Sequence, residues 1–408
     1  MNYKRKIATT IIKSTYDNDT SRPIIKIAIA SVAISLIVML VAKFVVQGFQ
    51  TEVAQKVSAF GSHIVISKYD RNNALEESFI LKDSLLINKL KEDKHVIHSQ
   101  YFAIKSGISK SKVNIQGLVL KGVGSDYDWS TFKNYIKYGD VLTLKGGTTD
   151  NGILISEYMA NLLELKLGDK MVVYFIQQPP KSRAFKIKGI YNTGLGEKSF
   201  DKSMAFIDIN QIQKLNQWET NQVYGIELIL DNLDNLNASG NAVYKAIPPE
   251  YKSETISQRF STMFEWLRLQ DLNVVIIITL IMIVASLNIL TLLLTIILQK
   301  TRMIGLLKTL GSTTKDLFYI FGLVSSKIMF KGMLIGNAVG LMFCFLQHQF
   351  KLIPLNQSIY YLSYVPIEFN WIYFILLNIG LLLASFFMVA ITTIVVGSIS
   401  PSKSIKTS

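Results

Sequence analysis

The chain of 408 residues is poor in the side chains that enzymes and metalloproteins use for chemistry. Its single cysteine, Cys344, lies inside an apolar run, which excludes a disulfide framework and a cysteine metal site. Of its four histidines, His95 and His98 are three residues apart, but no carboxylate stands at ligand spacing, so we expect solvent-exposed side chains and no metal. Gly-x-Ser-x-Gly and Cys/His arrangements for nucleophilic attack are absent. We therefore predict a protein that is not itself an enzyme.

A nucleotide-binding loop is absent as well. The pattern G-x-x-x-x-G-K-[ST] does not occur, and Leu120-Lys121-Gly122-Val123-Gly124 lacks both its spacing and its Lys-Ser/Thr pair. The chain therefore has no route of this kind to ATP, and we predict no cofactor of its own.

Acidic residues are scarce relative to basic ones. The sequence has 29 Asp and Glu against 43 Lys and Arg, a formal net charge of +14. The basic residues are scattered, without a basic helix interleaved with aromatic residues, so we predict no nucleic-acid partner. With 50% hydrophobic residues and a mean hydropathy of +0.31, the chain is too apolar to be wholly soluble. Anionic membrane lipid is the partner that best balances the charge.

Four apolar runs are long enough to cross a bilayer of about 30 Å, and they cover 24–46, 272–298, 317–350 and 371–399. The first is predicted to be an uncleaved anchor, because it is longer than a signal peptide's apolar part and no small-x-small cleavage site follows it. Lys43 lies near its far end, where the side chain can snorkel to the interface. The third contains Lys327 and Lys331, which would each cost about 3 kcal/mol at mid-bilayer. Since residues 332–350 alone span about 29 Å as a helix, both lysines are predicted at the interface.

Small and polar residues inside these runs predict how the spans pack. Gly332, Gly336 and Gly340 form a ladder of small residues that favours close helix packing. Asn288 and Asn337 are the polar residues placed best inside the membrane. We interpret them as partners in interhelical hydrogen bonds rather than as a transport path.

Residues 47–271 have the composition of a soluble α+β domain. At each end, an apolar stripe at helical spacing predicts a stalk helix that continues from the neighbouring span. The stripes are Phe49, Val53, Val57 and Phe60 at one end and Phe260, Met263, Phe264 and Leu267 at the other. We expect Gly61 to end the first stalk and the two stalks to pack on each other, with separate amphipathic helices against the domain as the alternative.

Alternation predicts strands in this domain, and apolar periodicity after N-cap residues predicts helices. The predicted strands cover 63–67, 113–120, 171–175, 185–191, 204–209 and 224–230. The predicted helices cover 83–91, 156–165, 210–218 and 236–246. We expect two subdomains, one near the membrane and one inserted between roughly Gly122 and Gly194.

The distribution of lysine and arginine predicts the orientation. The N-terminal tail 1–26 has six of these residues, the loop 299–316 has four and the tail 400–408 has two, whereas the loop 351–370 has only Lys351. Both termini and the loop 299–316 are therefore predicted to be cytoplasmic. The predicted fold class is an α-helical membrane protein with four transmembrane helices and an α+β extracytoplasmic domain carried on two stalk helices.

The loop 299–316, QKTRMIGLLKTLGSTTKD, carries the most specific pattern. One face of a short helix is predicted to be apolar, because apolar residues fall at i, i+3, i+4 and i+7, namely Met303, Leu306, Leu307 and Leu310. The remaining positions are largely basic. Gly311 follows, where a left-handed C-cap is expected, and residues 313–316 have the spacing of a capping box. On periodicity alone, an ordinary basic interfacial turn explains the pattern equally well.

The string TRMIGLLKTLGSTTKDL resembles the cytoplasmic loop of the FtsX-like permease superfamily of ABC transporters, in which a short helix docks on a partner ATPase. Further segments resemble the lipoprotein-releasing (LolC/LolE-type) permeases of that superfamily. These segments are Val46-Gln47-Gly48-Phe49, GLVLKG at 117–122, ILISEYMANLLELKLGD at 153–169, GIYNTG at 189–194 followed by Asp201, and a weakened C-terminal ending, SPSKSI, at 400–405.

The resemblance implies a non-catalytic membrane subunit of an ATP-driven complex in the bacterial inner membrane. Two permeases pair, identical or not, and a cytoplasmic ABC ATPase that binds the ATP docks on the loop 299–316. The docking residues so implied are Arg302, Met303, Leu306, Leu307, Lys308, Leu310 and Gly311. In the lipoprotein-releasing branch, such a machine extracts acylated lipoproteins from the inner membrane toward the outer membrane.

Two further sites follow from the same resemblance. The stalks would present a surface to lipoproteins, made of Phe49, Val53, Val57, Phe260, Phe264 and Leu267. A loop with two prolines would dock a periplasmic lipoprotein carrier, through Gln178, Pro179, Pro180 and Arg183. This loop is shorter than the family's, and a plain hairpin loop is the alternative. The alternatives for the whole chain are a force-transmitting permease of the FtsX or MacB kind, for efflux, signalling or cell-division control, and a membrane-anchored regulator that transports nothing.

Overall fold

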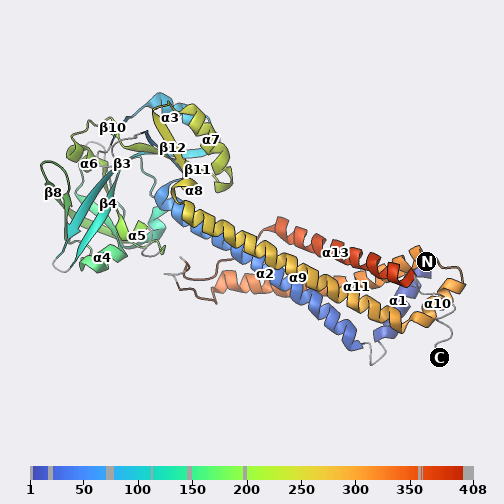
Figure 1. Cartoon of the computed structure of the whole chain (residues 1–408). Coiled ribbons are helices and arrows are strands. Elements are labelled where there is room, and N and C mark those ends of the chain that lie inside the picture. Colours follow the sequence, from blue (N-terminus) through green and yellow to red (C-terminus); the bar gives the residue numbers. More distant parts are fainter. Residues whose placement is uncertain are drawn as a thin grey trace. The chain divides into compact units, whose positions relative to one another are not determined.

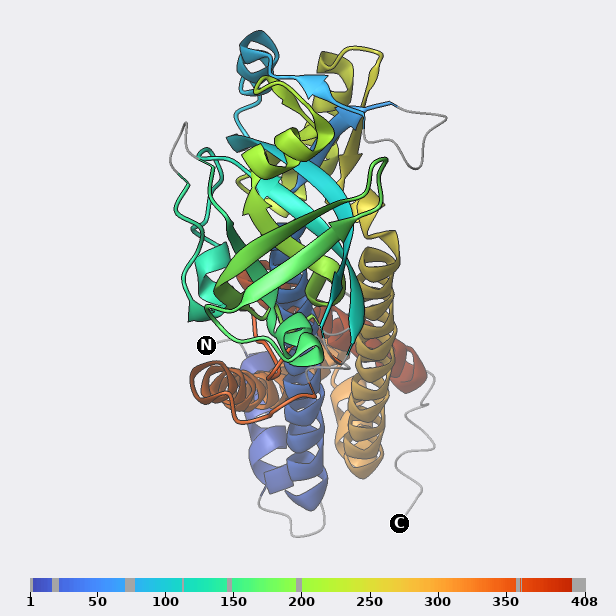
Figure 2. The same cartoon turned by 90° about the vertical axis from the view of Figure 1, so that its left-hand side faces the viewer.

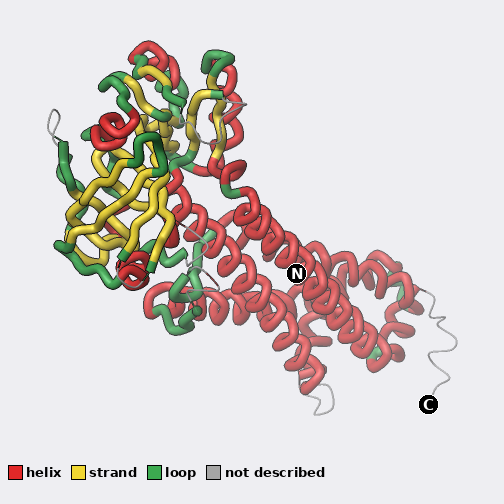
Figure 3. Tube along the Cα trace, turned by 60° about the vertical axis from the view of Figure 1, so that its left-hand side comes forward, coloured by secondary structure: helices red, strands yellow, loops and turns green. Residues whose placement is uncertain are grey.

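The structure, a computed structural model, describes residues 3–16, 22–69, 78–111, 114–144, 149–195, 200–356, 360 and 362–397. The predicted tail 400–408 and Val113, at the start of a predicted strand, lie outside the described residues. The chain divides into two compact units. The helical unit comprises Met1–Thr51, Leu267–Ile353 and Val365–Ser408, and the strand-rich unit comprises Glu52–Trp266 and Pro354–Tyr364. The described strands, drawn in yellow in Figure 3, belong to the strand-rich unit.

Four helices in the described part of the chain are long and apolar enough to cross a membrane, as the sequence predicts (Figure 1). They are α2 (Arg22–Gly61), α9 (Ser261–Gln299), α11 (Thr314–Phe350) and α13 (Trp371–Gly397). α2 and α9 have 40 and 39 residues, whereas a bilayer needs only about 20. Each of these two helices therefore extends well beyond a span and contributes residues to both units.

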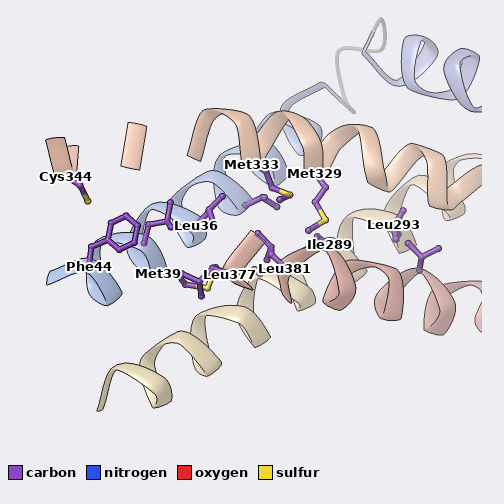
Figure 4. Packing of buried hydrophobic residues seen from close by; sticks show 14 of the residues in the cluster. Leu36, Met39, Phe44, Ile289, Leu293, Met329, Met333, Cys344, Leu377 and Leu381 are labelled. Atoms are coloured by element: carbon purple, nitrogen blue, oxygen red, sulfur yellow. The ribbon is translucent and has the colours of Figure 1, made fainter. Parts of the chain in front are cut away.

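The core of the helical unit gathers side chains from all four of these helices (Figure 4). It includes Leu36 of α2, Ile289 of α9, Met333 of α11 and Leu381 of α13. Cys344 is buried in the same cluster as a free thiol. The helices thus pack on one another through apolar side chains.

The glycine ladder of α11 packs directly on α2. A Cβ added to Gly332 would lie 2.8 Å from the Cβ of Val32, and one added to Gly336 would lie 2.9 Å from the carbonyl oxygen of Ala33. These distances leave no room for a side chain, so the predicted close packing is confirmed.

The intramembrane asparagines make the interhelical hydrogen bonds that the sequence predicts. Asn337 Nδ2 of α11 donates to Asn378 Oδ1 of α13 over 2.8 Å, and Asn288 Nδ2 of α9 donates to Ser31 Oγ of α2 over 2.5 Å. Both bonds join different helices, so each amide has a structural role.

Lys43, near the end of the first predicted span, is paired with a carboxylate, and its predicted snorkelling to the interface stays a prediction. It is buried on α2, and its Nζ lies 2.7 Å from Asp271 Oδ1 of α9 and 4.1 Å from the ring centre of Tyr373. Asp271 directly precedes the predicted second span and supplies the counter-charge that a buried ammonium needs.

A further helix lies within the polar N-terminal tail, where none is predicted. α1 (Tyr3–Tyr16) packs on α11 and buries Ala8 and Ile11. Its threonines and isoleucines have weak helix propensity. Its amphipathic packing, rather than its local sequence, therefore accounts for the helix.

The strand-rich unit is built on one sheet, part of which lies toward the viewer in Figure 2. The strand order is β12-β1-β11-β3-β4-β9-β6-β8-β5, and β7 pairs with both β3 and β8. These pairings close a ring through β3, β4, β9, β6, β8 and β7. The strands of this sheet are β1 (Ile64–Lys68), β3 (Val96–Lys110), β4 (Ile115–Val123), β5 (Ile136–Gly139), β6 (Gly152–Ser156), β7 (Lys170–Phe175), β8 (Lys181–Tyr191), β9 (Met204–Asp208), β11 (Gly225–Leu230) and β12 (Tyr251–Thr255). A separate pair joins β2 (Ile80–Leu81) to β10 (Gln222–Val223).

The predicted elements of this unit are found, with shifts at their ends. The six predicted strands correspond to β1, β4, β7, β8, β9 and β11. The four predicted helices correspond to α3 (Ser84–Leu90), α4 (Glu157–Leu163), α6 (Ile209–Asn216) and α7 (Leu236–Ala246), while α5 (Phe200–Ser203) and α8 (Ile256–Arg259) are additional short helices. The side chains of Asp83 and Ser156 accept the N-cap hydrogen bonds of α3 and α4.

The expected division into two subdomains is wrong. The segment between Gly122 and Gly194 supplies β5 to β8, and these strands are hydrogen-bonded into the same sheet as the rest. β6 pairs with β9, and β7 pairs with β3. Such long-range pairings cannot be read from local alternation, which is why the insertion resembles a unit of its own.

Candidate functional site

The loop 299–316 folds as its pattern predicts. α10 (Thr301–Thr309) is followed by Gly311, whose φ of +89° is the left-handed conformation expected of the cap. Thr313 and Asp316 then form a capping box, in which the Thr313 N–H donates to Asp316 Oδ2 over 2.9 Å. The turn between α10 and α11 is therefore a defined structure.

The apolar stripe of α10 is divided between two surroundings. Ile304 is fully buried, in a cluster that includes Leu317 and Phe321 of α11, and the partly buried Met303 and Leu307 pack on the same cluster. The predicted stripe omits Ile304, which is the main anchor of the helix. Met303 and Leu307 are half-buried against the protein's own bundle, because a helix this short is stabilised mainly by packing. Their contact with a partner stays a prediction.

A second face of α10 remains open. Leu306 is 59% exposed and Leu310 is 75% exposed, and Arg302 is exposed one turn before Leu306. These three residues stand at i, i+4 and i+8, on one side of the helix. We refer to Arg302, Leu306 and Leu310 as the docking face. Lys308 is half-buried and Gly311 is exposed beside it.

The N-terminal helix α1 reaches the turn after α10. Lys4 Nζ forms an ion pair with Asp316 Oδ1 and lies 5.8 Å from the ring centre of Tyr319. Asp316 therefore closes the capping box with one oxygen and binds α1 with the other. The sequence gives no sign of the Lys4–Asp316 pair, because the two residues meet only through the tertiary structure.

The predicted stalk residues are mostly closed off inside the chain. Of the six residues predicted to face lipoproteins, Val53 and Val57 are at most 1% exposed and Leu267 is 5% exposed. The other three residues of the set are half-buried, namely Phe49, Phe260 and Phe264. The predicted lipoprotein surface therefore reduces, in this conformation, to its three phenylalanines.

Phe60, in the last turn of α2, sits among aromatic rings of the strand-rich unit. Its ring centre lies 5.0 Å from that of Phe132, 5.3 Å from Tyr135, 5.5 Å from Tyr191 and 5.8 Å from Phe200. Rings at such distances contribute beyond the area they bury. The end of α2 is thus part of the domain's core rather than a free stalk.

The two-proline loop joins β7 to β8. Gln178, Pro179, Pro180 and Arg183 are all exposed, as a docking loop requires. Ile176, an apolar side chain beside them, is 85% exposed. Carrier docking stays a prediction.

Gly48 of the resemblance segment 46–49 marks a close contact within the helical unit. A Cβ on Gly48 would lie 2.9 Å from the backbone nitrogen of Glu368 and 2.9 Å from the carbonyl carbon of Pro366. The Glu368 N–H also donates to the carbonyl of Phe44, and Thr51 Oγ1 donates to the Glu368 carboxylate. The backbone of residues 366–368 therefore rests directly on α2.

Asp201, which follows the segment 189–194, is structural. It is 5% exposed and accepts hydrogen bonds from the backbone N–H and the hydroxyl of Thr193. Burial raises the pKa of this carboxyl, and the hydrogen bonds from Thr193 oppose that rise. The side chain holds the turn after β8 and is not placed for chemistry.

The two spaced histidines bind separate neighbours. His95 Nδ1 lies 3.0 Å from Asp231 Oδ2, and His98 Nε2 lies 2.8 Å from the carbonyl oxygen of Asp126. Among the residues that the structure describes, no group of three or more His, Cys, Asp and Glu could hold a metal ion.

Comparison with known proteins extends the resemblance. Residues 275–401 match the family described as FtsX-like permease C-terminal. The chain is 22% identical over 368 residues to the lipoprotein-releasing system transmembrane protein LolC of Neisseria meningitidis serogroup B, covering 83% of each chain. It is 21% identical over 369 residues to LolE of the same system in Haemophilus influenzae, covering 86% of each. The resemblance read from the sequence is therefore confirmed.

Solved structures also match, with low scores. The extracellular domain of the noncanonic ABC-type transporter YknZ from Gram-positive bacteria has a TM-score of 0.33 and 17% identity, covering 48% of this chain and 100% of that one. The periplasmic region of MacB from Actinobacillus actinomycetemcomitans has a TM-score of 0.33 and 12% identity, covering 51% and 95%.

Proposed function

We propose that this chain, which carries an FtsX-like permease C-terminal domain at residues 275–401, is the membrane subunit of an ABC transporter driven by a separate ATPase. The observation that carries the proposal is the docking face. α10 is fixed to the bundle through Ile304 while Leu306 and Leu310 stay exposed beside Arg302. Exposed leucines next to a cation, on a helix held rigidly from behind, suit the groove of a soluble partner protein.

The partner set follows from this assignment. A cytoplasmic ABC ATPase would bind the docking face and hydrolyse the ATP. A second permease, identical or not, would complete the membrane part in the bacterial inner membrane. With lysine and arginine concentrated in the segments 1–26 and 299–316, we place both in the cytoplasm. Cysteine at the exposed Lys315 should then escape an impermeant thiol reagent in spheroplasts, while cysteine at the exposed Ser130 should react. The reverse pattern would overturn the orientation.

Substitution of Leu306 tests the docking face. Leu306→Asp places a charge where an apolar contact is needed, and an unpaired buried charge costs several kcal/mol. Since Leu306 is 59% exposed, the permease itself should stay folded. We expect the ATPase subunit to be lost on purification from detergent, by at least tenfold, with the permease yield unchanged.

Thr314→Asp is the matched control. Thr314 is exposed at the first position of α11, where a negative charge is favourable, so the same charge enters the same loop without removing an apolar contact. This variant should retain the ATPase. Retention of the ATPase by Leu306→Asp as well would refute docking at this face.

For the cargo, we propose the extraction of acylated lipoproteins toward the outer membrane. The support is the resemblance to LolC and LolE across more than four fifths of each chain. The half-buried Phe49, Phe260 and Phe264 are then the candidates for contact with acyl chains, since each buried CH₂ of a tail contributes about 0.8 kcal/mol. The loop 178–183 is the candidate for contact with a periplasmic carrier.

A force-transmitting permease is the second candidate, and one observation favours it. Val53 and Val57 are 0% and 1% exposed within a single chain, which leaves a lipid tail no access to them. A photo-crosslinker at Phe264 separates the two functions. Extraction predicts capture of acylated lipoprotein before ATP is added and release afterwards. Force transmission predicts crosslinks to protein alone. It also predicts that lipoproteins still reach the outer membrane after the permease is depleted.

A further inference from the structure

The last turn of α2 ends inside the strand-rich unit, where its carbonyl groups need partners. The final carbonyls of any helix have no N–H donor within that helix. Ser62, with φ of +56°, ends the helix and donates its N–H to the carbonyl of Ser58. The carbonyls of Phe60 and Gly61 are satisfied instead by two cations from distant parts of the sequence.

Lys121 supplies the first cation. Its Nζ donates to the carbonyl of Phe60 over 3.3 Å and pairs with Glu227 Oε1 over 2.6 Å. Lys121 and Glu227 are 2% and 1% exposed, and Gln100 Nε2 donates to the second carboxylate oxygen of Glu227 over 2.8 Å. Lys121 lies on β4 and Glu227 on β11, so the contact links the helix end to two strands of the sheet.

Arg259 supplies the second cation. Its Nη1 donates to the carbonyl of Gly61 over 2.5 Å, and its guanidinium lies 5.5 Å from the ring centre of Phe260. Arg259 is the last residue of α8, directly before Phe260 and α9. A Cβ on Gly61 would lie 3.0 Å from Cε2 of Phe260, so the end of α2 contacts the residue that directly precedes α9.

The buried charged cluster of Lys121, Glu227 and Arg259 is not explained by its contribution to stability alone. Burial lowers the pKa of Lys121, and the carboxylate of Glu227, 2.6 Å away, opposes that effect. A buried ion pair is often no more stabilising than an apolar pair of similar volume. Its distinct property is the directed contact between Lys121 and the carbonyl of Phe60 at the end of α2.

We propose that Lys121, Glu227 and Arg259 form a joint that couples the outer ends of α2 and α9 to strands β4 and β11. The inference rests on the proposed function, in which ATP binding at the docking face moves the long helices. Through the joint, a displacement of α2 or α9 enters the sheet directly. It also assigns a role to the lysine of the segment 117–122, one of the segments in which the sequence resembles lipoprotein-releasing permeases.

The first experiment tests the joint in the purified full-length permease. Lys121→Met with Glu227→Gln removes both charges together, so no unpaired ion is left buried, and the amide introduced by Glu227→Gln can still bond to Gln100. We expect amide hydrogen exchange in residues 58–62 to accelerate at least tenfold, while the thermal midpoint stays near that of wild type. Lys188→Met, which breaks an exposed ion pair with Asp150, is the control and should leave this exchange unchanged. Unchanged exchange in the double variant would overturn the joint.

The second experiment tests coupling in the permease–ATPase complex. In wild type, a non-hydrolysable ATP analogue should alter exchange in the β4 and β11 peptides 117–123 and 225–230. In the double variant and in Arg259→Met, this response should be lost while the ATPase stays bound and active within twofold. Arg259→Lys, which keeps a cation, should restore most of it.

The two hypotheses fail in distinguishable ways. If no ATPase binds the wild-type permease, the proposed function fails, while exchange at residues 58–62 still decides whether the joint exists. If the ATPase binds and the nucleotide response persists without the three side chains, the role of the joint in coupling is refuted. A variant whose thermal unfolding midpoint falls together with its nucleotide response would also count against the role of the joint in coupling. A structural defect would then explain both changes.

Discussion

Two apolar stripes at helical spacing, one on α10 and one on the last turns of α2, look alike in the sequence and differ in the structure. On α10 the stripe is split, with Met303 and Leu307 turned inward and Leu306 exposed. On α2 it is covered by the chain itself, since Val53 and Phe60 are fully buried. Periodicity therefore predicts that a face is apolar, but not what covers it. Only the face that a chain leaves open can take a partner.

The largest expected effect comes from emptying the covered stripe. Phe60→Ala should lower the free energy of unfolding of the strand-rich unit by about 3–5 kcal/mol, because a cavity opens among the rings around it. Trp129 packs on Phe132 in the same group of rings, with centres 5.2 Å apart. Its fluorescence during denaturant titration, in a background with the other three tryptophans replaced by phenylalanine, would report the loss.

Leu306→Ala is the control for this variant, because it truncates an exposed apolar side chain of the other stripe. It should change stability by less than about 0.5 kcal/mol. Equal losses in the two variants would remove the distinction between a covered and an open stripe.

The next effect is a pH dependence at the end of α2. His63 follows that end, and its Nδ1 accepts the N–H of Leu230 over 3.1 Å, so the ring is neutral. Burial lowers its pKa from 6.5 to about 4. Between pH 6.5 and about pH 4, His63 is therefore protonated in the unfolded chain but stays neutral in the folded chain. The contribution to stability is full above pH 6.5, declines as the pH falls, and levels off below about pH 4.

The gap between a pKa of 6.5 and one of about 4 corresponds to about 3 kcal/mol, at roughly 1.4 kcal/mol per pH unit. Unfolding of the strand-rich unit at pH 7 and pH 4.5 would measure most of this difference. His63→Asn, whose side-chain oxygen can accept the same hydrogen bond, should show a smaller difference between the two pH values. A dependence as steep as that of wild type would mean that other groups titrate.

The smallest of these effects concerns the inner face of α10. Ile304→Ala should destabilise the helical unit by about 2 kcal/mol, because the residue is fully buried but sits in a short peripheral helix. The side chains of the docking face would be unchanged, but α10 would be held less rigidly against the bundle. Thermal unfolding should shift while ATPase binding weakens only severalfold, in contrast to the near-complete loss expected for Leu306→Asp. Complete loss of the ATPase in Ile304→Ala would mean that α10 docks through its buried side.

Local chemistry explains which parts of the fold the sequence predicts. The left-handed Gly311, the capping box at Thr313 and the glycine ladder at Gly332 and Gly336 each depend on residues close in the sequence or on a simple steric rule, and the structure contains all of them. The same is true of strands with clean alternation, such as β7.

The features that the sequence does not predict depend on distant contacts. β3, with 15 residues, has polar side chains on both faces and is specified by its pairing with β4, β7 and β11. α1 depends on packing against α11. The buried Lys121 looks like an ordinary basic residue until Glu227 and the carbonyl of Phe60 are placed beside it. In the candidate site, the sequence does not reveal Ile304 for the same reason, since only α11 shows which side of α10 faces inward.

The bare backbone at Gly48 restricts how α2 can move. A roll of α2 about its own axis by one residue, about 100°, would push Gln47 or Phe49 against the backbone of residues 366–368, where even a Cβ does not fit. α2 and residues 366–368 must therefore move together as a rigid body. While they remain in contact, α2 cannot transmit a movement by rotating about its own axis. A chimaera that exchanges residues 365–370 with those of another permease would need to bring the matching part of α2 with them.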